Sequence, residues 1–353
     1  MSATVLSEGD TVLVTGGAGY VGSHLVRSLL SRGCRVRVLD TFLYGASGLN
    51  GCMADPGLEL MDGDICNIRD MIRATNGVKA VIALAALVGD GACDLNHDET
   101  VAINIEATKL LCQVVGLNSD IARVVFASSC SVYGATEDLV LNEGSQLSPV
   151  SFYARSRILS ESILARELEG RSVVTLRLGT VFGASERMRL DLMVNTMTWN
   201  AITLGKIKVM GGDSWRPHVH VRDVADAFAT AAEASDEQVG GETFNVGSDQ
   251  NNMTISETAV MVANEVGDTE IEYIDENNDA RSYRVSFEKV RHVLGFAPRH
   301  RIEDGVQEMA ELFRTGRIDG SDPRYSNLAY LREFGFTGQR GSALPGLPGE
   351  RVA

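Results

Sequence analysis

The first half of the chain alternates short apolar runs with longer segments of helical periodicity. The apolar runs are rich in β-branched residues and lack polar alternation, so we interpret them as strands buried on both faces of a sheet. They cover residues 11–15, 35–40, 58–61, 79–84 and 123–127. The segments 20–32, 68–75 and 98–117 between them have the apolar spacing of helices. This repetition predicts an α/β fold with a Rossmann-type, doubly wound parallel sheet.

The second half continues this pattern and then departs from it. A helix is predicted at 152–168 and a strand at 172–178. Shorter, mixed elements follow: strands at 206–210, 243–246 and 271–274, and helices that begin at Asp223 and Ser256. We therefore predict a Rossmann domain over residues 1–180 and a smaller mixed α/β lobe over 181–337, with some segments returning to the first domain. Residues 338–353 are rich in Gly and Pro and lack periodicity, which predicts a flexible tail.

A glycine-rich turn follows the first predicted strand. It reads Gly16-Gly-Ala-Gly19-Tyr-Val-Gly22, and an apolar helix comes directly after it. Glycines allow a pyrophosphate to approach the amino terminus of such a helix closely. Asp40 ends the second strand, about 20 residues further on, where a carboxylate accepts hydrogen bonds from a ribose 2′-hydroxyl and repels a 2′-phosphate. The combination predicts a dinucleotide site with NAD, rather than NADP, as the cofactor.

Candidate catalytic groups lie on a later strand and the helix that follows it. The strand at 123–127 leads into Ser128-Ser-Cys-Ser-Val-Tyr-Gly134, so Ser129 lies near the edge of the sheet where ligands bind. Tyr153 and Arg157 are four residues apart on the predicted helix and therefore share one face. We expect the Ser129 hydroxyl, the phenol and the guanidinium to contact the same bound molecule.

These motifs resemble those of the extended short-chain dehydrogenases/reductases, typified by UDP-galactose 4-epimerase and dTDP-glucose 4,6-dehydratase. The resemblance covers residues 11 to about 310 and rests on Gly16 to Gly22, Asp62-Gly-Asp64-Ile65, Leu84-Ala-Ala86, Asn104, Arg216-Pro-His-Val-His and Phe244-Asn-Val-Gly-Ser. It implies NAD as the cofactor, a nucleotide-diphosphate sugar as the substrate, and a substrate-binding role for the smaller lobe. It also implies a homodimer built through two helices, one of which carries Tyr153.

The resemblance implies roles for individual residues. The cofactor-binding residues would be Gly16, Gly19, Tyr20, Val21, Gly22, Asp40, Asp64, Ile65, Ala85, Ala86, Asn104, Tyr153 and Arg157. The substrate-binding residues would be Ser129, Ser131, Thr180, Arg216 and Arg281, with Thr180 at a position where the family usually has Asn. Ser129, Tyr153 and Arg157 would be catalytic. In the family the residue at the Asn104 position supports the helix that carries the catalytic Tyr.

The chain departs from the family at Arg157, where the family has Lys. A guanidinium can still lower the pKa of a neighbouring Tyr through its charge. It is, however, planar and longer than an ammonium group, and it does not give up its proton. Two interpretations follow. In one, the enzyme is active and Arg157 holds the nicotinamide ribose; in the other, a weakened or inactive member binds cofactor and sugar without turnover.

Cys130 and Ser131 discriminate between the reactions of the family. The resembling 4,6-dehydratases have Asp-Glu at these two positions, and decarboxylases of UDP-glucuronate keep Glu at the second. Cys130 is expected to belong to the core, because neighbours on a strand point to opposite sides. What remains is hydride transfer with one proton transfer, so we predict a nucleotide-sugar 4-epimerase. The alternatives are a 4-dehydrogenase or 4-ketoreductase, and a catalytically weak protein that binds NAD and sugar nucleotide.

The composition of the chain argues against several other kinds of partner and site. The net charge of −15 argues against nucleic acid as the main partner. The six cysteines form no C-x-x-C pair and none lies at zinc-ligand spacing from a His, so we predict no metal site. The amino terminus lacks the pattern of a signal peptide, and the apolar run at 81–88 is too short to span a bilayer. We therefore expect a cytoplasmic protein without a membrane partner.

Overall fold

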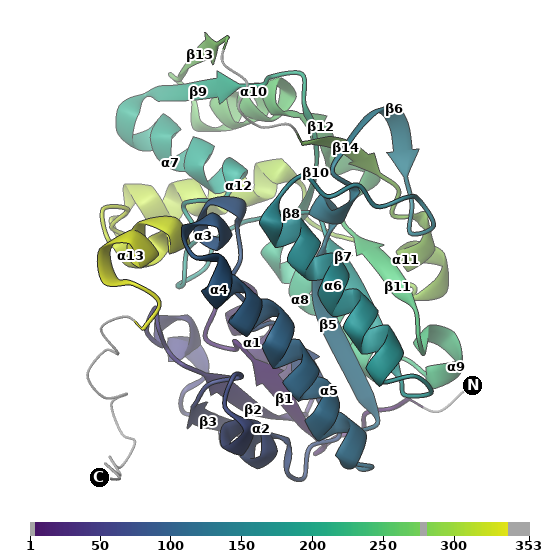
Figure 1. The fold of residues 1–353 in the computed structure, drawn as a ribbon. Coiled ribbons are helices and arrows are strands. Elements are labelled where there is room, and N and C mark those ends of the chain that lie inside the picture. Colours follow the sequence, from purple (N-terminus) through teal and green to yellow (C-terminus); the bar gives the residue numbers. More distant parts are fainter. Residues whose placement is uncertain (1–3, 276–280, 338–353) are drawn as a thin grey trace.

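The computed structural model describes residues 4–275 and 281–337 (Figure 1). The predicted tail at 338–353 lies outside the described residues. At the centre is a seven-stranded parallel sheet in the order β3-β2-β1-β4-β5-β7-β11. Its strands are β1 (Thr11–Thr15), β2 (Arg35–Asp40), β3 (Leu58–Asp62), β4 (Ala80–Ala83), β5 (Arg123–Ser129), β7 (Val173–Leu178) and β11 (Thr243–Val246). The prediction of a doubly wound parallel sheet is confirmed.

Helices cover both faces of this sheet, and each face has its own apolar core. On one face α1 (Tyr20–Ser31) packs against α8 (Val221–Glu233). On the other face α2 (Ile68–Thr75), α5 (Ala107–Leu117) and α6 (Phe152–Glu167) lie side by side, with α5 and α6 in front of the sheet in Figure 1. Burial on both faces explains why the strand sequences are continuously apolar rather than alternating.

The helix expected over residues 98–117 is interrupted. It begins as α4 (His97–Thr100), widens into a π-helical segment (Val101–Glu106) and continues as α5. By length and composition alone, residues 97–117 would be able to cross a membrane. The α5 part packs on α6 and α2, however, and its residues Leu111, Cys112 and Val115 are buried in the core between these helices and the sheet. We therefore interpret it as a core helix.

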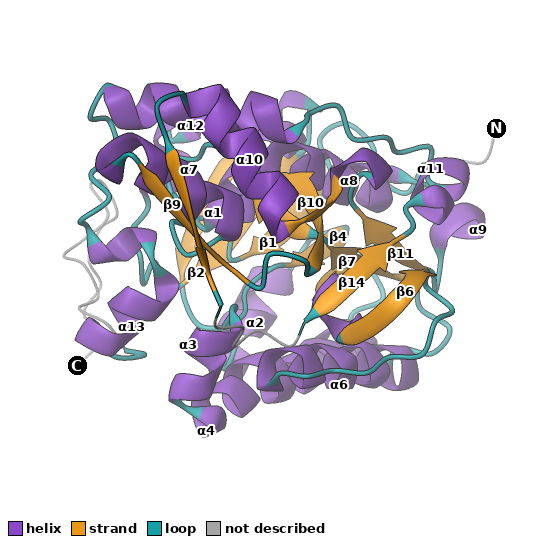
Figure 2. Ribbon diagram, turned by 90° about the horizontal axis from the view of Figure 1, so that it is seen from above, coloured by secondary structure: helices purple, strands orange, loops and turns teal. Residues whose placement is uncertain are grey.

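A smaller lobe lies at one end of the sheet (Figures 1 and 2). It has a third apolar core and is built from α7 (Met193–Leu204), α10 (Ile255–Val266), α12 (Ile302–Arg314), β9 (Lys206–Met210) and β13 (Glu270–Ile274). Nearby strands are β6 (Ala135–Leu141), β8 (Thr180–Phe182), β10 (Trp215–His220), β12 (Asn252–Thr254) and β14 (Ser282–Val285). Short helices are α3 (Asp90–Leu95), α9 (Asp236–Val239), α11 (Glu288–Val293) and α13 (Asn327–Phe334).

The chain passes between the two parts more than once. Strand β11 lies within the range predicted for the smaller lobe but pairs with β7 at the edge of the main sheet, and α8 covers one face of that sheet. The division near residue 180 and the substrate-binding role of the smaller lobe stay predictions.

Candidate active site

A cavity of about 570 Å³ lies beside the carboxyl ends of the strands. The order of the sheet reverses between β1 and β4, and parallel sheets bind ligands at such a reversal. The cavity wall includes every residue that the sequence suggested for cofactor or substrate binding except Asn104 and Arg216. The structure thus brings these residues together at one cavity, from the ends of β1, β2, β3, β4, β5 and β7 and from α6. The binding role of each residue stays a prediction.

The glycine turn packs so closely that side chains would not fit. Gly16 has a φ of 72°, and a Cβ there would lie 2.9 Å from the backbone of Ala85. A Cβ on Gly22 would lie 2.2 Å from the carbonyl oxygen of Gly16. Helix α1 begins after Gly19 with no side-chain cap and no acidic residue in its first turn. Its first N–H groups are therefore available to an anionic ligand, which suits a pyrophosphate.

Asp40 is held beside this turn by two backbone hydrogen bonds. Its Oδ2 accepts from the N–H of Ala18 at 3.0 Å, and its Oδ1 accepts from the N–H of Phe42 at 2.8 Å. Burial raises the pKa of this carboxyl above its usual value, while the two N–H groups act in the opposite direction. Each carboxyl oxygen can accept a further hydrogen bond. The glycine turn, the uncapped helix and Asp40 together fit the pyrophosphate and adenosine ribose of NAD.

Ser129, Tyr153 and Arg157 meet at the end of β5. Ser129 lies beside the Tyr153 phenol, whose pKa it lowers as a hydrogen-bonding neighbour, and Ser129 Oγ accepts from the N–H of Ser131 at 3.2 Å. The guanidinium carbon of Arg157 lies 5.6 Å from the centre of the Tyr153 ring and 5.5 Å from that of Phe126. Arg157 Nη1 donates to the carbonyl oxygen of Ala127 at 3.4 Å. The group that sequence analysis expected is therefore assembled in one place.

Burial and charge act against each other on the Tyr153 phenol. Burial is the larger effect and raises its pKa above the usual value for Tyr. The Arg157 guanidinium and the hydrogen bond with Ser129 lower it, while Cys93 and Asp90 raise it. The cation expected to keep the phenol acidic is thus present, but in the protein alone it only partly offsets burial.

Several buried polar atoms on the cavity wall have no hydrogen-bond partner among the described residues. They are Asp90 Oδ1, Ser131 Oγ, Arg157 Nε and Arg187 Nε. Buried polar groups in folded proteins nearly always have a partner, and leaving one without a partner is costly. Their concentration on one wall fits a polar ligand that supplies the missing partners.

The two predicted site residues outside the wall lie directly behind it. Asn104 is buried; its Nδ2 donates to Ser156 Oγ on α6 at 3.1 Å, and its Oδ1 accepts from the N–H of Leu87 at 2.9 Å. Arg216 Nη1 donates to the carbonyl oxygen of Arg281 at 2.6 Å. Asn104 thus supports the helix that carries Tyr153, and Arg216 holds the backbone of a wall residue.

Sequence reasoning missed an acidic residue and two basic residues of the wall. Asp90, at the start of α3, pairs with Arg281 across 2.6 Å. Arg187 stacks on the Tyr44 ring at 4.1 Å, and burial together with the neighbouring Arg189 lowers its pKa to about 10. The signal in the sequence was the two arginines Arg187 and Arg189, which follow the predicted substrate-binding residue Thr180 in an acidic chain.

A buried ion pair lies beside Ser128. Arg177 of β7 contacts Glu161 of α6 through two hydrogen bonds, of 2.7 and 3.1 Å, and Ser128 Oγ also donates to Glu161. Cys130 is fully buried beside them and opens a 3₁₀ turn (Cys130–Tyr133) instead of continuing the strand. Its expected core position agrees with the structure, but strand alternation was the wrong reason for it.

His218 and His220 lie on the same strand, β10, but they form no metal site with other side chains that the structure describes. Both are fully buried, and among residues 4–275 and 281–337 the structure contains no group of three or more His, Cys, Asp or Glu side chains able to hold a metal ion. His220 stacks on His300, and His218 Nε2 lies 3.3 Å from Thr258 Oγ1.

The sheet, the glycine turn and the paired Ser129 and Tyr153 define the class as a dinucleotide-binding α/β enzyme fold. The sequence model of the NAD dependent epimerase/dehydratase family matches residues 12–247, and the chain belongs to this family. It is therefore an enzyme of the extended short-chain dehydrogenase/reductase type, and family membership confirms the prediction of NAD as the cofactor.

The similar proteins include both epimerases and dehydratases. A UDP-glucose 4-epimerase from Bacillus subtilis (strain 168) is 31% identical over 268 residues, which are 67% of this chain and 76% of that protein. A dTDP-glucose 4,6-dehydratase from Actinoplanes sp. is 27% identical over 327 residues, covering 87% and 98%. The structure of MoeE5 in complex with UDP-glucose and NAD has a TM-score of 0.76 at 28% identity, covering 88% and 100%.

Proposed function

We propose that this protein is an NAD-dependent nucleotide-sugar 4-epimerase in which Tyr153 is the acid and base. The observation that carries the proposal is the placement of Tyr153 beside Ser129 and Arg157 on the wall of the same cavity as the glycine turn. NAD, when bound, supplies the carrier that takes a hydride from the sugar carbon and returns it. A UDP sugar is the substrate class we favour, because similar proteins carry UDP sugars in their names.

Tyr153 and Ser129 would share the proton transfer. The ionised phenol of Tyr153 removes the proton of the C4 hydroxyl as the carbon loses its hydride, and Ser129 Oγ donates a hydrogen bond to the same oxygen. The resulting 4-keto sugar turns over within the cavity. Tyr153 then returns its proton when the hydride is added to the opposite face. Proton and hydride are both restored, so the cycle leaves no net redox change.

Arg157 would have an electrostatic and a positioning role. Its charge lowers the pKa of Tyr153, which increases the fraction of phenolate at neutral pH. Its unpartnered Nε lies on the cavity wall, where it is able to bind the hydroxyls of a ribose. Since Arg does not release its proton, the proton of the phenol must leave by another route.

Arg281 and Thr180 are the wall residues that we assign to the diphosphate sugar. A guanidinium binds phosphate through bidentate, charge-assisted hydrogen bonds. Arg281 is paired with Asp90 in this structure, so the substrate phosphate would compete with that carboxylate. Cys130 and Ser131 offer no carboxylate for the elimination of water, which favours epimerisation over 4,6-dehydration.

The expected homodimer, built through two helices of which one is α6 with Tyr153, stays a prediction, and we propose α5 as the second helix. Leu159 on α6 and Leu117 at the end of α5 are exposed apolar side chains on those two helices. Their exposure supports the prediction, because apolar groups are concentrated at the cores of homodimer interfaces.

One assay separates the proposed activity from its two alternatives. The NAD-loaded protein is incubated with UDP-, GDP- and dTDP-sugars while absorbance is followed at the band of reduced nicotinamide and the sugars are separated. An inverted sugar without lasting reduction supports the epimerase. Lasting reduction with release of a keto sugar identifies a 4-dehydrogenase or, in reverse, a 4-ketoreductase. Binding of NAD and sugar without either change identifies a catalytically weak binding protein.

A further inference from the structure

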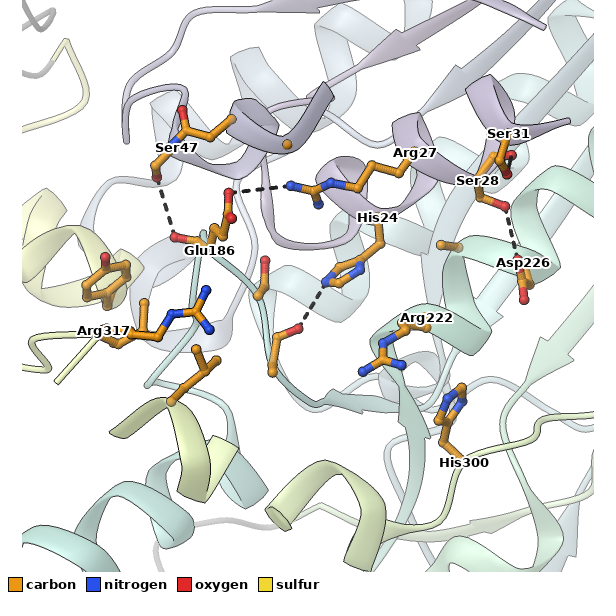
Figure 3. A pocket seen from close by; sticks show the side chains of 18 of the residues that line it. His24, Arg27, Ser28, Ser31, Ser47, Glu186, Arg222, Asp226, His300 and Arg317 are labelled. Carbon is orange, nitrogen blue, oxygen red and sulfur yellow. Dashed lines mark hydrogen bonds and ion pairs between the residues drawn. The ribbon is translucent and has the colours of Figure 1, made fainter. Parts of the chain in front are cut away.

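A second cavity, of about 1080 Å³, lies away from the cofactor cavity (Figure 3). Its walls come from α1, from the 3₁₀ helix Ser47–Cys52, from α8, from the loop after β8, and from the end of α12 with the segments on either side of it. None of its lining residues was part of the sequence-based site. The proposed reaction does not use it.

Basic side chains line this cavity, although the net charge of the whole chain is −15. Arg27, Arg222, Arg299 and Arg317 line it, and the acidic side chains on its wall are Glu186 and Asp226. In Figure 3 the side chains of Arg222 and Arg317 extend into the hollow from opposite sides. A cleft lined mainly by one sign of charge attracts ligands of the other sign.

The carboxylates on the wall already have partners. Glu186 pairs with Arg27 at 3.4 Å. Asp226 accepts a hydrogen bond from Ser28 Oγ at 3.0 Å and also pairs with Arg32, which lies outside the wall, at 3.5 Å. Each of these carboxylates thus already balances an arginine, and among the described residues neither pairs with Arg299 or Arg317.

Two of the four arginines have side chains without a hydrogen-bond or ion-pair partner among the described residues. Arg222 pairs with Glu308, and Arg27 donates to the carbonyl oxygen of Gly48 in addition to its ion pair. The side chains of Arg299 and Arg317 are exposed, and within the part of the chain that the structure describes they make no hydrogen bond or ion pair. The cavity thus offers two guanidinium groups with all of their donors free.

Neutral polar groups complete the wall. Ser31, the last residue of α1, and Ser47, which begins the 3₁₀ helix Ser47–Cys52, contribute hydroxyl oxygens. Each hydroxyl donates to a backbone carbonyl, that of Ser31 to Ser28 and that of Ser47 to Glu186, and its oxygen can still accept a hydrogen bond. His24 contributes a ring that stays neutral near pH 7, because burial and the nearby Arg27 lower its pKa to about 4. Hydroxyls and a neutral ring are suited to the uncharged part of a ligand, whereas the free arginines are suited to an anionic end.

We propose that this cavity is a second ligand site, which takes a small phosphorylated molecule. The phosphate pairs with Arg299 and Arg317, since the planar guanidinium matches phosphate oxygens in a bidentate way. A hydroxylated body contacts Ser31 and Ser47. The volume is of the order of known small-molecule sites, which run to about 1,000 Å³.

The new site is structurally separate from the cofactor cavity but shares one segment with it. Ala184, Ser185 and Glu186 line the second cavity, whereas Arg187 and Arg189 line the cofactor cavity. The phosphate-binding residues of the two sites do not overlap. Substitutions in one site therefore distinguish phosphate bound there from phosphate bound at the other.

The test is calorimetric titration of the NAD-loaded protein with inorganic pyrophosphate in phosphate-free buffer. We expect Arg299→Ala/Arg317→Ala to weaken binding at least tenfold, and Arg281→Ala, in the cofactor cavity, to leave this site intact. The charge-matched control is Arg69→Ala/Arg73→Ala on α2, where both side chains are also exposed. All the replaced groups of the second site and of the control are exposed, so folding is expected to persist.

Two results would overturn the proposal. One is the absence of pyrophosphate binding at millimolar concentration in the wild-type protein. The other is binding that is unchanged in Arg299→Ala/Arg317→Ala, or that disappears in Arg281→Ala alone, because the phosphate would then occupy the cofactor cavity. Neither result depends on whether the protein is an epimerase.

Discussion

The guanidinium carbon of Arg157 lies 5.6 Å from the centre of the Tyr153 ring, one helical turn away on the same face of α6. Both side chains are on the wall of the cofactor cavity, and burial lowers the pKa of Arg157 while it raises that of Tyr153. Placing the two groups together favours the charged form of each, because a cation and a phenolate attract. We expect the pair to act as one unit, with Arg157 at the position where the resemblance implies Lys.

Arg157→Met is expected to shift the pH dependence of turnover. In the proposed mechanism the phenolate of Tyr153 is the active form, so kcat is expected to rise with pH until the phenol is ionised. Removing the cation raises the pKa of Tyr153 further, which moves this rise by about 1–3 pH units to higher pH. Arg157→Lys should keep the profile close to that of the wild type. The control Arg155→Met changes an exposed residue of the same helix and should leave the profile unchanged; an unshifted profile in Arg157→Met would contradict the electrostatic role.

Tyr153→Phe should lower kcat by about 10²–10⁴-fold, the usual contribution of a general acid or base. NAD binding should persist, since the glycine turn and Asp40 are untouched. Turnover and the dissociation constant of NAD are measured on the same preparation. A rate equal to that of the wild type would remove the phenol from the mechanism.

Gly22→Ala should impair both stability and NAD binding. The added Cβ would lie 2.2 Å from the Gly16 carbonyl oxygen, so the turn or the helix must move. Overpacking of this kind costs about 1–3 kcal/mol in the free energy of unfolding. The control is Gly116→Ala in α5, where an added Cβ meets nothing within 4 Å. Urea unfolding and NAD titration are the measurements; a Gly22→Ala protein that matches the control in both would contradict the close packing of the turn.

Glu161→Gln should destabilise the fold by about 3–5 kcal/mol, because it leaves the buried Arg177 without its carboxylate. Glu167→Gln, at the end of the same helix, breaks an exposed pair with Arg166 and should cost less than about 1 kcal/mol. Urea unfolding compares the two variants. Equal losses would show that the Arg177 pair contributes no more than a surface contact.

Substitutions at Arg281 and Asp90 should have opposite effects on the affinity for UDP. Arg281→Ala removes charge-assisted hydrogen bonds to phosphate, worth about 1.5–3 kcal/mol each, and should weaken binding about 10-fold or more. Asp90→Asn releases Arg281 from its 2.6 Å ion pair and should strengthen binding. Calorimetry with UDP tests both. Unchanged affinity in Arg281→Ala would assign the diphosphate to other residues.

The sequence predicted the part of the fold in which local pattern and tertiary structure agree. Strands β1, β2 and β11 and helix α2 have the predicted bounds, because apolar β-branched runs and helical spacing determine them locally. The glycine turn and Asp40 were predictable for the same reason: the strand before the turn and the helix after it are both encoded nearby. The glycines and Asp40 both line one cavity in the structure, and their roles in binding stay predictions.

Features that depend on distant contacts were not predictable. Helix α13 was missed, and it brings Leu331 to the cavity wall from far along the chain. Helix α12 was also missed, although its buried residues follow local helical spacing and were therefore predictable. The partner of Arg281 is Asp90, 191 positions earlier, which no local pattern signals. The π-helical segment at Val101–Glu106 was also missed, because its apolar spacing fits an ordinary helix. It contains Asn104, whose hydrogen bonds to Leu87 and Ser156 exist only in the folded chain.

The most direct test follows deuterium at C4 of the sugar. UDP-glucose labelled with deuterium at C4 is incubated with the NAD-loaded protein in ordinary water, and the product is examined by proton and deuterium NMR. We predict a C4-inverted sugar that keeps its deuterium, because the label returns as a hydride to the carbon from which it came. Inversion with loss of the label to solvent, or a stable keto sugar with deuterium left on the reduced cofactor, would contradict the proposed epimerase mechanism.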